Sequence, residues 1–316
     1  MSTAAPRPDP GIITEAGVYD LTMERYHGQP CAGPSVSSSG LRTIWSASPA
    51  HYYLDSSLNP DREPPGEKAH FSLGRAAHHL LFLGQKGFAE EFVVRPEQWS
   101  DWRSKEARLW KEAAITDGKT VLTDADLAAI TGMARSLAAH PLVKAGILDG
   151  AVERSLLWQD PDSGVWLKSR PDVIPNDSGD VADLKTTVSV ATEALRRTIA
   201  DYHYAMQGAL VGMGFEAVLQ RQMQSFSLVF VEKTPPYCCR VVTLRPSDLE
   251  RGERQVRAAA AIFADCCTRE EWPGPGGTQQ DAEYLSPSEW SVKQVDERLE
   301  LLASENDAQP LTHAAE

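Results

Sequence analysis

The sequence predicts a single α/β or α+β domain, in which a central mixed sheet is flanked by helices and preceded by a helical N-terminal elaboration. Two observations lead to this prediction. Apolar residues recur at helical spacing in several segments before residue 140 and after residue 190, whereas β-rich runs gather within residues 151–186 and 223–244. The chain has 316 residues and no visible internal repeat, which suits one large domain.

The expected elements follow one another along the chain. Residues 1–16 are expected to be flexible, residues 17–290 to form the domain, and residues 291–316 to form an acidic, flexible tail. The serines at 37–39 predict the start of a short helix that ends at Ser48-Pro49. Further helices are expected over 67–83, 104–115, 124–139, 191–200, 204–214 and 246–269, and strands over 151–159, 165–173, 180–186, 223–232 and 237–244.

Charge is unevenly distributed. The net charge is -13, and residues 278–316 carry nine acidic residues against Lys293 and Arg298, a net of -7. This acidity argues against a nucleic-acid coat protein. A basic group near the central strands is nevertheless compatible with DNA held briefly as a substrate, and it comprises Arg75, Lys168, Arg170, Lys185, Arg196 and Arg197.

Hydropathy, the N-terminal sequence and cysteine usage all favour an intracellular protein. No run of about 18 apolar residues occurs, and the N-terminus lacks the basic and apolar regions of a signal peptide. We therefore expect the protein in the cytoplasm, with no membrane partner. The five cysteines lack the spacing of a disulfide framework or a zinc site, so reduced thiols are expected.

Asp172 and the run Asp183-Leu184-Lys185 are the strongest candidates for chemistry. Alternation along a strand places Asp183 and Lys185 on the same face. A turn at residues 175–179 would pair the flanking strands as a hairpin and bring Asp172 close to Asp183. Two carboxylates beside an ammonium could hold a hard divalent cation and activate water against a phosphodiester. The alternative is a surface salt-bridge cluster, but Asp183 interrupts an apolar run, where an unpaired carboxylate is costly.

Three other polar residues have open interpretations. His78 shares a helix face with Arg75, although a helical histidine is more often structural. Glu153 falls in the first predicted strand and could either join a metal site or pair with Arg154. Gln207 could orient Lys185 or simply lie on a partly exposed helix.

Taken together, these segments resemble the PD-(D/E)XK nuclease superfamily, in particular the exodeoxyribonuclease VIII (RecE-like) exonucleases of phages and prophages. The resemblance runs from about Gly11 to Trp290 and is specific as a set rather than in any one motif. It is carried by 34–42 with 48–52, by Phe71-Ser72-Leu73-Gly74-Arg75-Ala76-Ala77-His78, by Arg170-Pro171-Asp172 followed by Asp183-Leu184-Lys185-Thr186-Thr187, and by Tyr202-His203-Tyr204-Ala205-Met206-Gln207.

The resemblance implies a restriction-endonuclease-like core and a role for each matching residue. It implies Mg²⁺, for which Mn²⁺ could substitute, held by Asp172, Asp183 and the Leu184 carbonyl, with Lys185 positioning or deprotonating the attacking water. His78 and Glu153 would also belong to the metal site, where they would flank the metal and hold a second cation or the scissile phosphate, and Gln207 would orient Lys185 or the DNA end. Related nucleases often carry a tyrosine where this chain has Val211, so either a DNA contact or a support for Gln207 is lost here, or Tyr202 or Tyr204 replaces the tyrosine. The expected DNA contacts are Arg75, Lys168, Arg170 and Tyr204.

The implied activity is a 5′-to-3′ exonuclease acting on linear double-stranded DNA and leaving 3′ single-stranded overhangs for recombination. The resemblance also implies a single-strand annealing protein as partner and a ring-shaped trimer or tetramer. Two alternatives stay open: a nuclease of the same fold with another task, such as an endonuclease or RecB-like processing enzyme, and a non-catalytic protein that binds DNA ends.

Overall fold

A computed structural model describes residues 6–63, 73–176, 178–277 and 282–307 of the chain. The chain divides into two compact units, residues 1–275 and residues 276–316. The described part of the second unit contains one helix, α11 (Glu289–Asp307). No helix among the described residues is both long and apolar enough to span a membrane.

The strands of the first unit form two larger sheets and two strand pairs. One sheet has the order β1-β6-β7-β2, and another has the order β11-β10-β9, in which β10 is parallel to β9 and antiparallel to β11. The pairs are β3-β4 and β5-β8. The bounds are β1 (Gly17–Tyr19), β2 (Ser35–Ser37), β3 (Phe92–Val94), β4 (Thr120–Leu122), β5 (Gly150–Val152), β6 (Ser155–Gln159), β7 (Trp166–Ser169), β8 (Val173–Pro175), β9 (Asp180–Thr187), β10 (Ser225–Glu232) and β11 (Cys239–Thr243).

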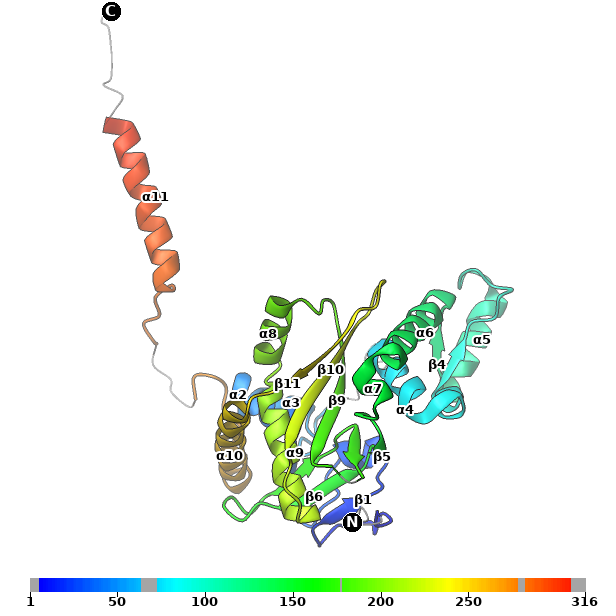
Figure 1. Cartoon of the computed structure of the whole chain (residues 1–316). Coiled ribbons are helices and arrows are strands. Elements are labelled where there is room, and N and C mark those ends of the chain that lie inside the picture. The colour runs from blue at the N-terminus through cyan, green and yellow to red at the C-terminus, as the bar shows by residue number, and fades with distance from the viewer. Residues whose placement is uncertain (1–5, 64–72, 177, 278–281, 308–316) are drawn as a thin grey trace, which may run out of the picture. The chain divides into compact units, whose positions relative to one another are not determined.

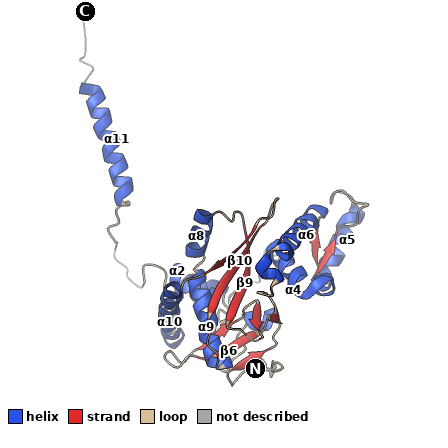
Figure 2. Cartoon of the chain, in the orientation of Figure 1, coloured by secondary structure: helices blue, strands red, loops and turns tan. Residues whose placement is uncertain are grey.

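The helices lie on both faces of the sheet β11-β10-β9, as Figure 1 shows for α9 and α10 on one side and α4 and α6 on the other. Figure 2 shows the same strands in red between the two groups of helices. The bounds are α1 (Met23–His27), α2 (Ser38–Ser46), α3 (Pro49–Asp55), α4 (Leu73–Glu91), α5 (Lys105–Thr116), α6 (Asp124–Ala139), α7 (Pro141–Lys144), α8 (Thr192–Asp201), α9 (Tyr204–Leu219) and α10 (Pro246–Arg269).

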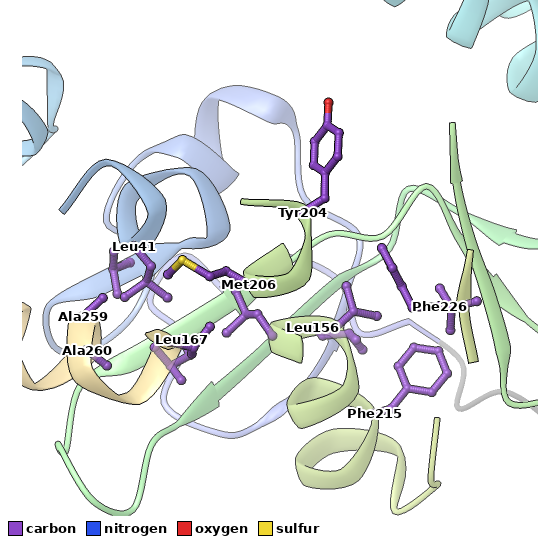
Figure 3. Close-up of a cluster of buried hydrophobic side chains, with 14 of the residues drawn as sticks. Leu41, Leu156, Leu167, Tyr204, Met206, Phe215, Phe226, Ala259 and Ala260 are labelled. Carbon is purple, nitrogen blue, oxygen red and sulfur yellow. The ribbon is translucent and has the colours of Figure 1, made fainter. Parts of the chain in front are cut away.

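Strand alternation divides the buried residues of β9 and β10 between two cores. Val181 of β9 packs in the first core, and Ala182 packs in the second, against α4 and α6. The first core also receives apolar residues of α9, α10 and the four-stranded sheet. Figure 3 shows part of it, including Leu41, Leu156, Leu167, Met206, Phe215, Phe226, Ala259 and Ala260.

The expected hairpin between residues 165–173 and 180–186 is wrong. β7 instead lies between β6 and β2, β8 pairs with β5, and β9 pairs with β10. The pairing of β9 with β10 is parallel and spans the crossover through α8 and α9, so a turn signal next to β9 did not reveal it. The expected strand 151–159 is also interrupted, because Glu153 has a left-handed φ of 51° between β5 and β6.

Residues 6–16 and 289–307 contain structure that the sequence did not predict. Residues 6–16 were expected to be flexible, but Ile13 is fully buried and its N–H donates to the Pro30 carbonyl at 2.8 Å. At the other end, helix α11 occupies most of the segment predicted to be a flexible tail, with Val292, Val295, Leu299 and Leu302 at helical spacing. The first unit ends at residue 275, whereas the sequence placed the domain boundary at residue 290.

The other predicted elements are found close to their expected bounds. Helices predicted over 104–115, 124–139, 191–200, 204–214 and 246–269 correspond to α5, α6, α8, α9 and α10, and the antiparallel pair predicted over 223–232 and 237–244 corresponds to β10 and β11. The helix predicted from residue 67 corresponds to α4. Its first part, including Phe71 and Ser72 of the proposed motif, lies outside the described residues.

Candidate active site

Strand β9 places Asp183 and Lys185 on the same face, as the alternation of the strand predicts. Asp183 is buried, at 1% exposure, and forms an ion pair with Lys185. Helix α9 lies over this face, and the side-chain amide of Gln207 donates to Asp183 Oδ1 at 2.8 Å. The carboxylate is therefore held from the strand on one side and from the helix on the other.

Asp172 reaches this pair from a connection outside the sheet that contains β9. It lies between β7 and β8, and its Oδ2 accepts a hydrogen bond from the backbone N–H of Leu184 at 2.6 Å. The N–H and C=O of one strand residue point to the same side, so the Leu184 carbonyl also points toward Asp172. A tertiary hydrogen bond, rather than a hairpin, thus brings the two predicted carboxylates together.

His78 and Glu153 complete the polar group around Asp172. His78 Nε2 lies 2.9 Å from Asp172 Oδ1, and His78 Nδ1 lies 3.5 Å from Glu153 Oε1. The left-handed conformation of Glu153 directs its N–H to the Asp172 carbonyl at 2.9 Å. His78 therefore bridges two carboxylates and orients Asp172, and all six residues predicted to be catalytic gather in one place.

Burial and mutual charge shift the pKa values of this group. Burial, followed by the charge of Asp172, raises the pKa of Asp183 to about 6. For Asp172, burial is outweighed by His78, Lys185 and the Leu184 N–H, so its pKa lies below the ordinary value. Burial likewise opposes the charged forms of Lys185 and His78, but the neighbouring carboxylates outweigh it and raise both pKa values. The two carboxylates thus repel each other where water screens poorly.

A cavity of about 700 Å³ opens onto these residues. Four of its lining side chains are mostly buried, and we call them the floor of the cavity: His78, Glu153, Asp172 and Lys185. Three of the expected DNA contacts, Arg75, Arg170 and Tyr204, also line it, as do residues that the sequence did not single out: Met23, His79, Val188 and Lys233. Lys233 reaches the cavity from the turn after β10, whose position depends on the parallel pairing with β9.

The expected DNA contacts differ in how accessible they are. Arg75 is half-exposed and forms an ion pair with Glu91. Arg170 is mostly buried, where it donates to the Leu21 carbonyl at 2.8 Å and to Glu153 Oε2 at 3.3 Å. Tyr204 is largely buried beneath Lys185, whose Nζ lies 5.2 Å from the centre of the ring.

Lys168 does not fit the expected phosphate contact. It is buried at 2% exposure, and its Nζ donates to the carbonyls of Tyr26 at 2.8 Å and Gly28 at 2.7 Å. Burial lowers its pKa to about 8. The alternation that puts Lys168 on an inward face of β7 turns it toward the carboxyl end of α1, where it satisfies backbone carbonyls.

The position of Val211 is also informative. Val211 lies one turn after Gln207 on α9, is buried and packs in the first core. A contact with DNA from this position is therefore excluded by its burial. Tyr204, the first residue of α9, and Tyr202, at the C-terminus of α8, both line the cavity.

A comparison with protein-family models identifies the chain. Residues 37–284 match the model of a PDDEXK-like domain of unknown function, DUF3799. The chain belongs to this family. The predicted PD-(D/E)XK-type fold is thus confirmed, whereas the finer resemblance to RecE-like exonucleases stays a prediction.

One solved structure has a similar fold. A crystal structure named "putative exonuclease", from Eubacterium rectale, is similar with a TM-score of 0.53 at 10% sequence identity, covering 86% of this chain and 98% of that chain. A crystal structure of SSO0001 is 19% identical over 61% of this chain and 86% of that chain, with a TM-score of 0.28, which is too low to bear on the fold. No curated protein matches the sequence significantly.

The donor set of the site fits a hard divalent cation of the kind that PDDEXK nucleases generally use. Within the described residues, no group of three or more His, Cys, Asp or Glu side chains is arranged to hold a metal ion. Two carboxylates with a backbone carbonyl are nevertheless an oxygen set that Mg²⁺ accepts, because it usually keeps several waters. Asp183 Oδ2 is buried without a well-formed hydrogen bond among the described residues, although Lys185 lies beside it. A cation there would relieve the repulsion between Asp172 and Asp183.

Proposed function

We propose that this protein is a divalent-metal-dependent nuclease that digests linear double-stranded DNA from its ends. The observation that carries the proposal is the convergence of Asp172, Asp183 and Lys185: Asp172 and Lys185 line one cavity, and the buried Asp183 pairs with Lys185 behind it. Two buried carboxylates that repel each other are costly in a protein that only binds DNA. They suit a site that accepts a cation and a phosphate together.

Mg²⁺ or Mn²⁺, held by Asp172, Asp183 and the Leu184 carbonyl, would supply Lewis-acid polarisation of the phosphate and a more acidic water. Hydrolysis adds water to phosphorus and breaks one P–O bond, so negative charge develops on the phosphate oxygens. The ammonium of Lys185 would stabilise that charge. In the metal-free protein, burial opposes the charge of Lys185, but the neighbouring carboxylates outweigh it and raise its pKa.

The remaining residues would position this machinery. His78 bridges Asp172 and Glu153, and Gln207 holds Asp183, so each carboxylate has a partner that fixes its direction. Lys233 on the turn after β10 is exposed at the cavity and is suited to a DNA phosphate. Such contacts make binding weaken as salt rises.

The finer parts of the proposal rest on the resemblance to RecE-like exonucleases alone, whereas the structural neighbour named "putative exonuclease" supports only digestion from DNA ends. They are 5′-to-3′ polarity, 3′ overhangs for recombination, a single-strand annealing protein as partner and a ring-shaped trimer or tetramer.

Digestion of an end-labelled linear duplex tests the proposal. Wild type, Lys185→Ala and Lys293→Ala are compared with Mg²⁺ or Mn²⁺, beside a closed circular control. Lys293 is an exposed lysine on α11, so its variant should behave as wild type. We expect wild type to shorten only the linear DNA, and the position of the label to report the polarity of digestion. The rate of Lys185→Ala should be at least 100-fold lower, which is roughly the effect of removing one preorganised charge-stabilising group. Cutting of the circle would indicate an endonuclease, and intact DNA in every lane would contradict the proposal.

A further inference from the structure

The mouth of the catalytic cavity carries apolar side chains that the proposed chemistry does not use. Met23, Val188 and Tyr202 all line the cavity, and they are 50%, 85% and 60% exposed. Single exposed apolar residues are common on protein surfaces, but contiguous ones at a site often mark binding. These three come from α1, from the segment after β9 and from the end of α8, so the fold brings them to one cavity from three places.

Tyr202 is held in a defined position. It caps the C-terminus of α8, and its carbonyl accepts a hydrogen bond from Arg42 Nη1 at 2.7 Å. Its ring is stacked on that of Tyr204, with 14° between the planes and 5.7 Å between the centroids. One face of the Tyr202 ring is thus covered by Tyr204. Tyr202 is 60% exposed and lines the cavity, so much of the residue is accessible to a ligand there.

The stack connects the mouth of the cavity with its charged floor. Tyr204 lies beneath Lys185, and Lys185 pairs with Asp183. A nucleotide has the same two parts, a charged phosphate and a flat base. If a phosphate binds near Lys185, the attached base can reach Tyr202, because the rings of Tyr202 and Tyr204 connect the exposed edge of the cavity with Lys185.

We propose that Met23, Val188 and Tyr202 form a nucleobase subsite, in which Tyr202 stacks on the base next to the scissile phosphate. This inference rests on the proposed function and extends it to the contact with the base. Because every base has a flat face, the subsite accepts all four bases.

The test measures stacking of a base on Tyr202 under conditions in which the DNA is not cleaved. A short linear duplex with 2-aminopurine at its terminal nucleotide is bound to the protein with Ca²⁺ in place of Mg²⁺, and fluorescence and affinity are measured. Wild type, Tyr202→Phe and Tyr202→Ala are compared with Tyr53→Ala. Tyr53 is stacked on Trp272 with 15° between the planes but does not line the cavity. Thermal unfolding of each variant checks that it is folded.

We expect wild type, Tyr202→Phe and Tyr53→Ala to quench the fluorescence, and Tyr202→Ala to leave it unquenched and to bind about 5- to 150-fold more weakly. An abasic terminal nucleotide should remove the difference in affinity between wild type and Tyr202→Ala. Equal quenching by Tyr202→Ala, or a difference in affinity that survives the abasic substrate, would overturn the inference. Altered self-association in place of altered quenching would point to a protein contact and overturn it too.

The cleavage assay with Mg²⁺ separates this inference from the proposed function. If wild type quenches through Tyr202 but cuts no DNA, the nuclease proposal fails and the base subsite stands. If wild type cuts DNA and Tyr202→Ala quenches equally, the nuclease proposal stands and the subsite fails. A wild-type protein that does not bind the duplex at all contradicts both.

Discussion

Replacing Asp183 with asparagine should stabilise the metal-free protein while removing the proposed activity. In the folded state burial and the charge of Asp172 raise the pKa of Asp183 from 3.8 to about 6. The folded protein therefore retains a proton between these pH values that the unfolded chain has lost. Its stability falls as pH rises through this window, and the full cost is present at pH 7.

The size of the effect follows from the same pKa. The difference between 3.8 and about 6 corresponds to about 3 kcal/mol, since one pH unit is worth about 1.4 kcal/mol. The favourable ion pair with Lys185 is already included, because the ammonium lowers this pKa by less than burial and Asp172 raise it. Asparagine is neutral, and its side-chain oxygen can still accept the hydrogen bond from Gln207. The gain should shrink to about half by pH 5.

Urea unfolding in EDTA at pH 5 and pH 7 measures this gain in the free energy of unfolding. The same experiment with Mg²⁺ in place of EDTA measures how much the cation stabilises each variant. Asp180→Asn is the matched control, because Asp180 lies in the same strand but is exposed. Mg²⁺ should raise the free energy of unfolding of wild type and of Asp180→Asn, and raise that of Asp183→Asn much less. The reasoning is refuted if Asp183→Asn destabilises the metal-free protein at pH 7, or if Mg²⁺ stabilises it as much as wild type.

Two further predictions concern packing and a buried lysine. Gly252→Ala should lower the free energy of unfolding by about 1–3 kcal/mol, because the added Cβ would lie 2.3 Å from the Ala205 carbonyl oxygen, where α10 packs on α9. Gly274→Ala is the control, because nothing lies within 4 Å of a Cβ added there. Calorimetry should show a lower melting temperature for Gly252→Ala only, and equal melting temperatures of the two variants would contradict the close packing. Burial lowers the pKa of Lys168 from 10.5 to about 8, so the folded protein loses this proton at a lower pH than the unfolded chain does. The stability of wild type relative to Lys168→Met should therefore rise between about pH 8 and 10.5. Denaturant unfolding across this range measures this difference in the free energy of unfolding, and a difference that falls with pH would contradict the reasoning.

The chemistry of the site could be predicted from the sequence where it depends on local geometry. The period of a strand is two residues, so Asp183 and Lys185 had to share a face wherever the strand lay. The apolar neighbours of Asp183 also indicated burial, and the carboxylate is buried. The resemblance added His78, Glu153 and Gln207, and the fold brings them to the same group.

What could not be predicted depends on contacts between segments far apart in the chain. The parallel pairing of β9 with β10 crosses two helices, and a turn signal next to β9 favoured a local hairpin instead. Lys168 follows the alternation of its strand as expected, but which face of β7 is covered depends on α1, about 140 residues earlier. Lys233 and Met23 reach the cavity only through such long-range packing.

The hydrogen bond from the Leu184 N–H to Asp172 has a consequence for finding related proteins by pattern. Because β8 and β9 pair with other strands, no hairpin register ties the number of residues between Asp172 and Asp183 to the geometry of the carboxylates. A longer or shorter connection can preserve the same two ligands as long as the hydrogen bond forms. A search motif with a fixed gap can therefore overlook relatives that a motif with a variable gap, anchored on the strand that ends in lysine, would find.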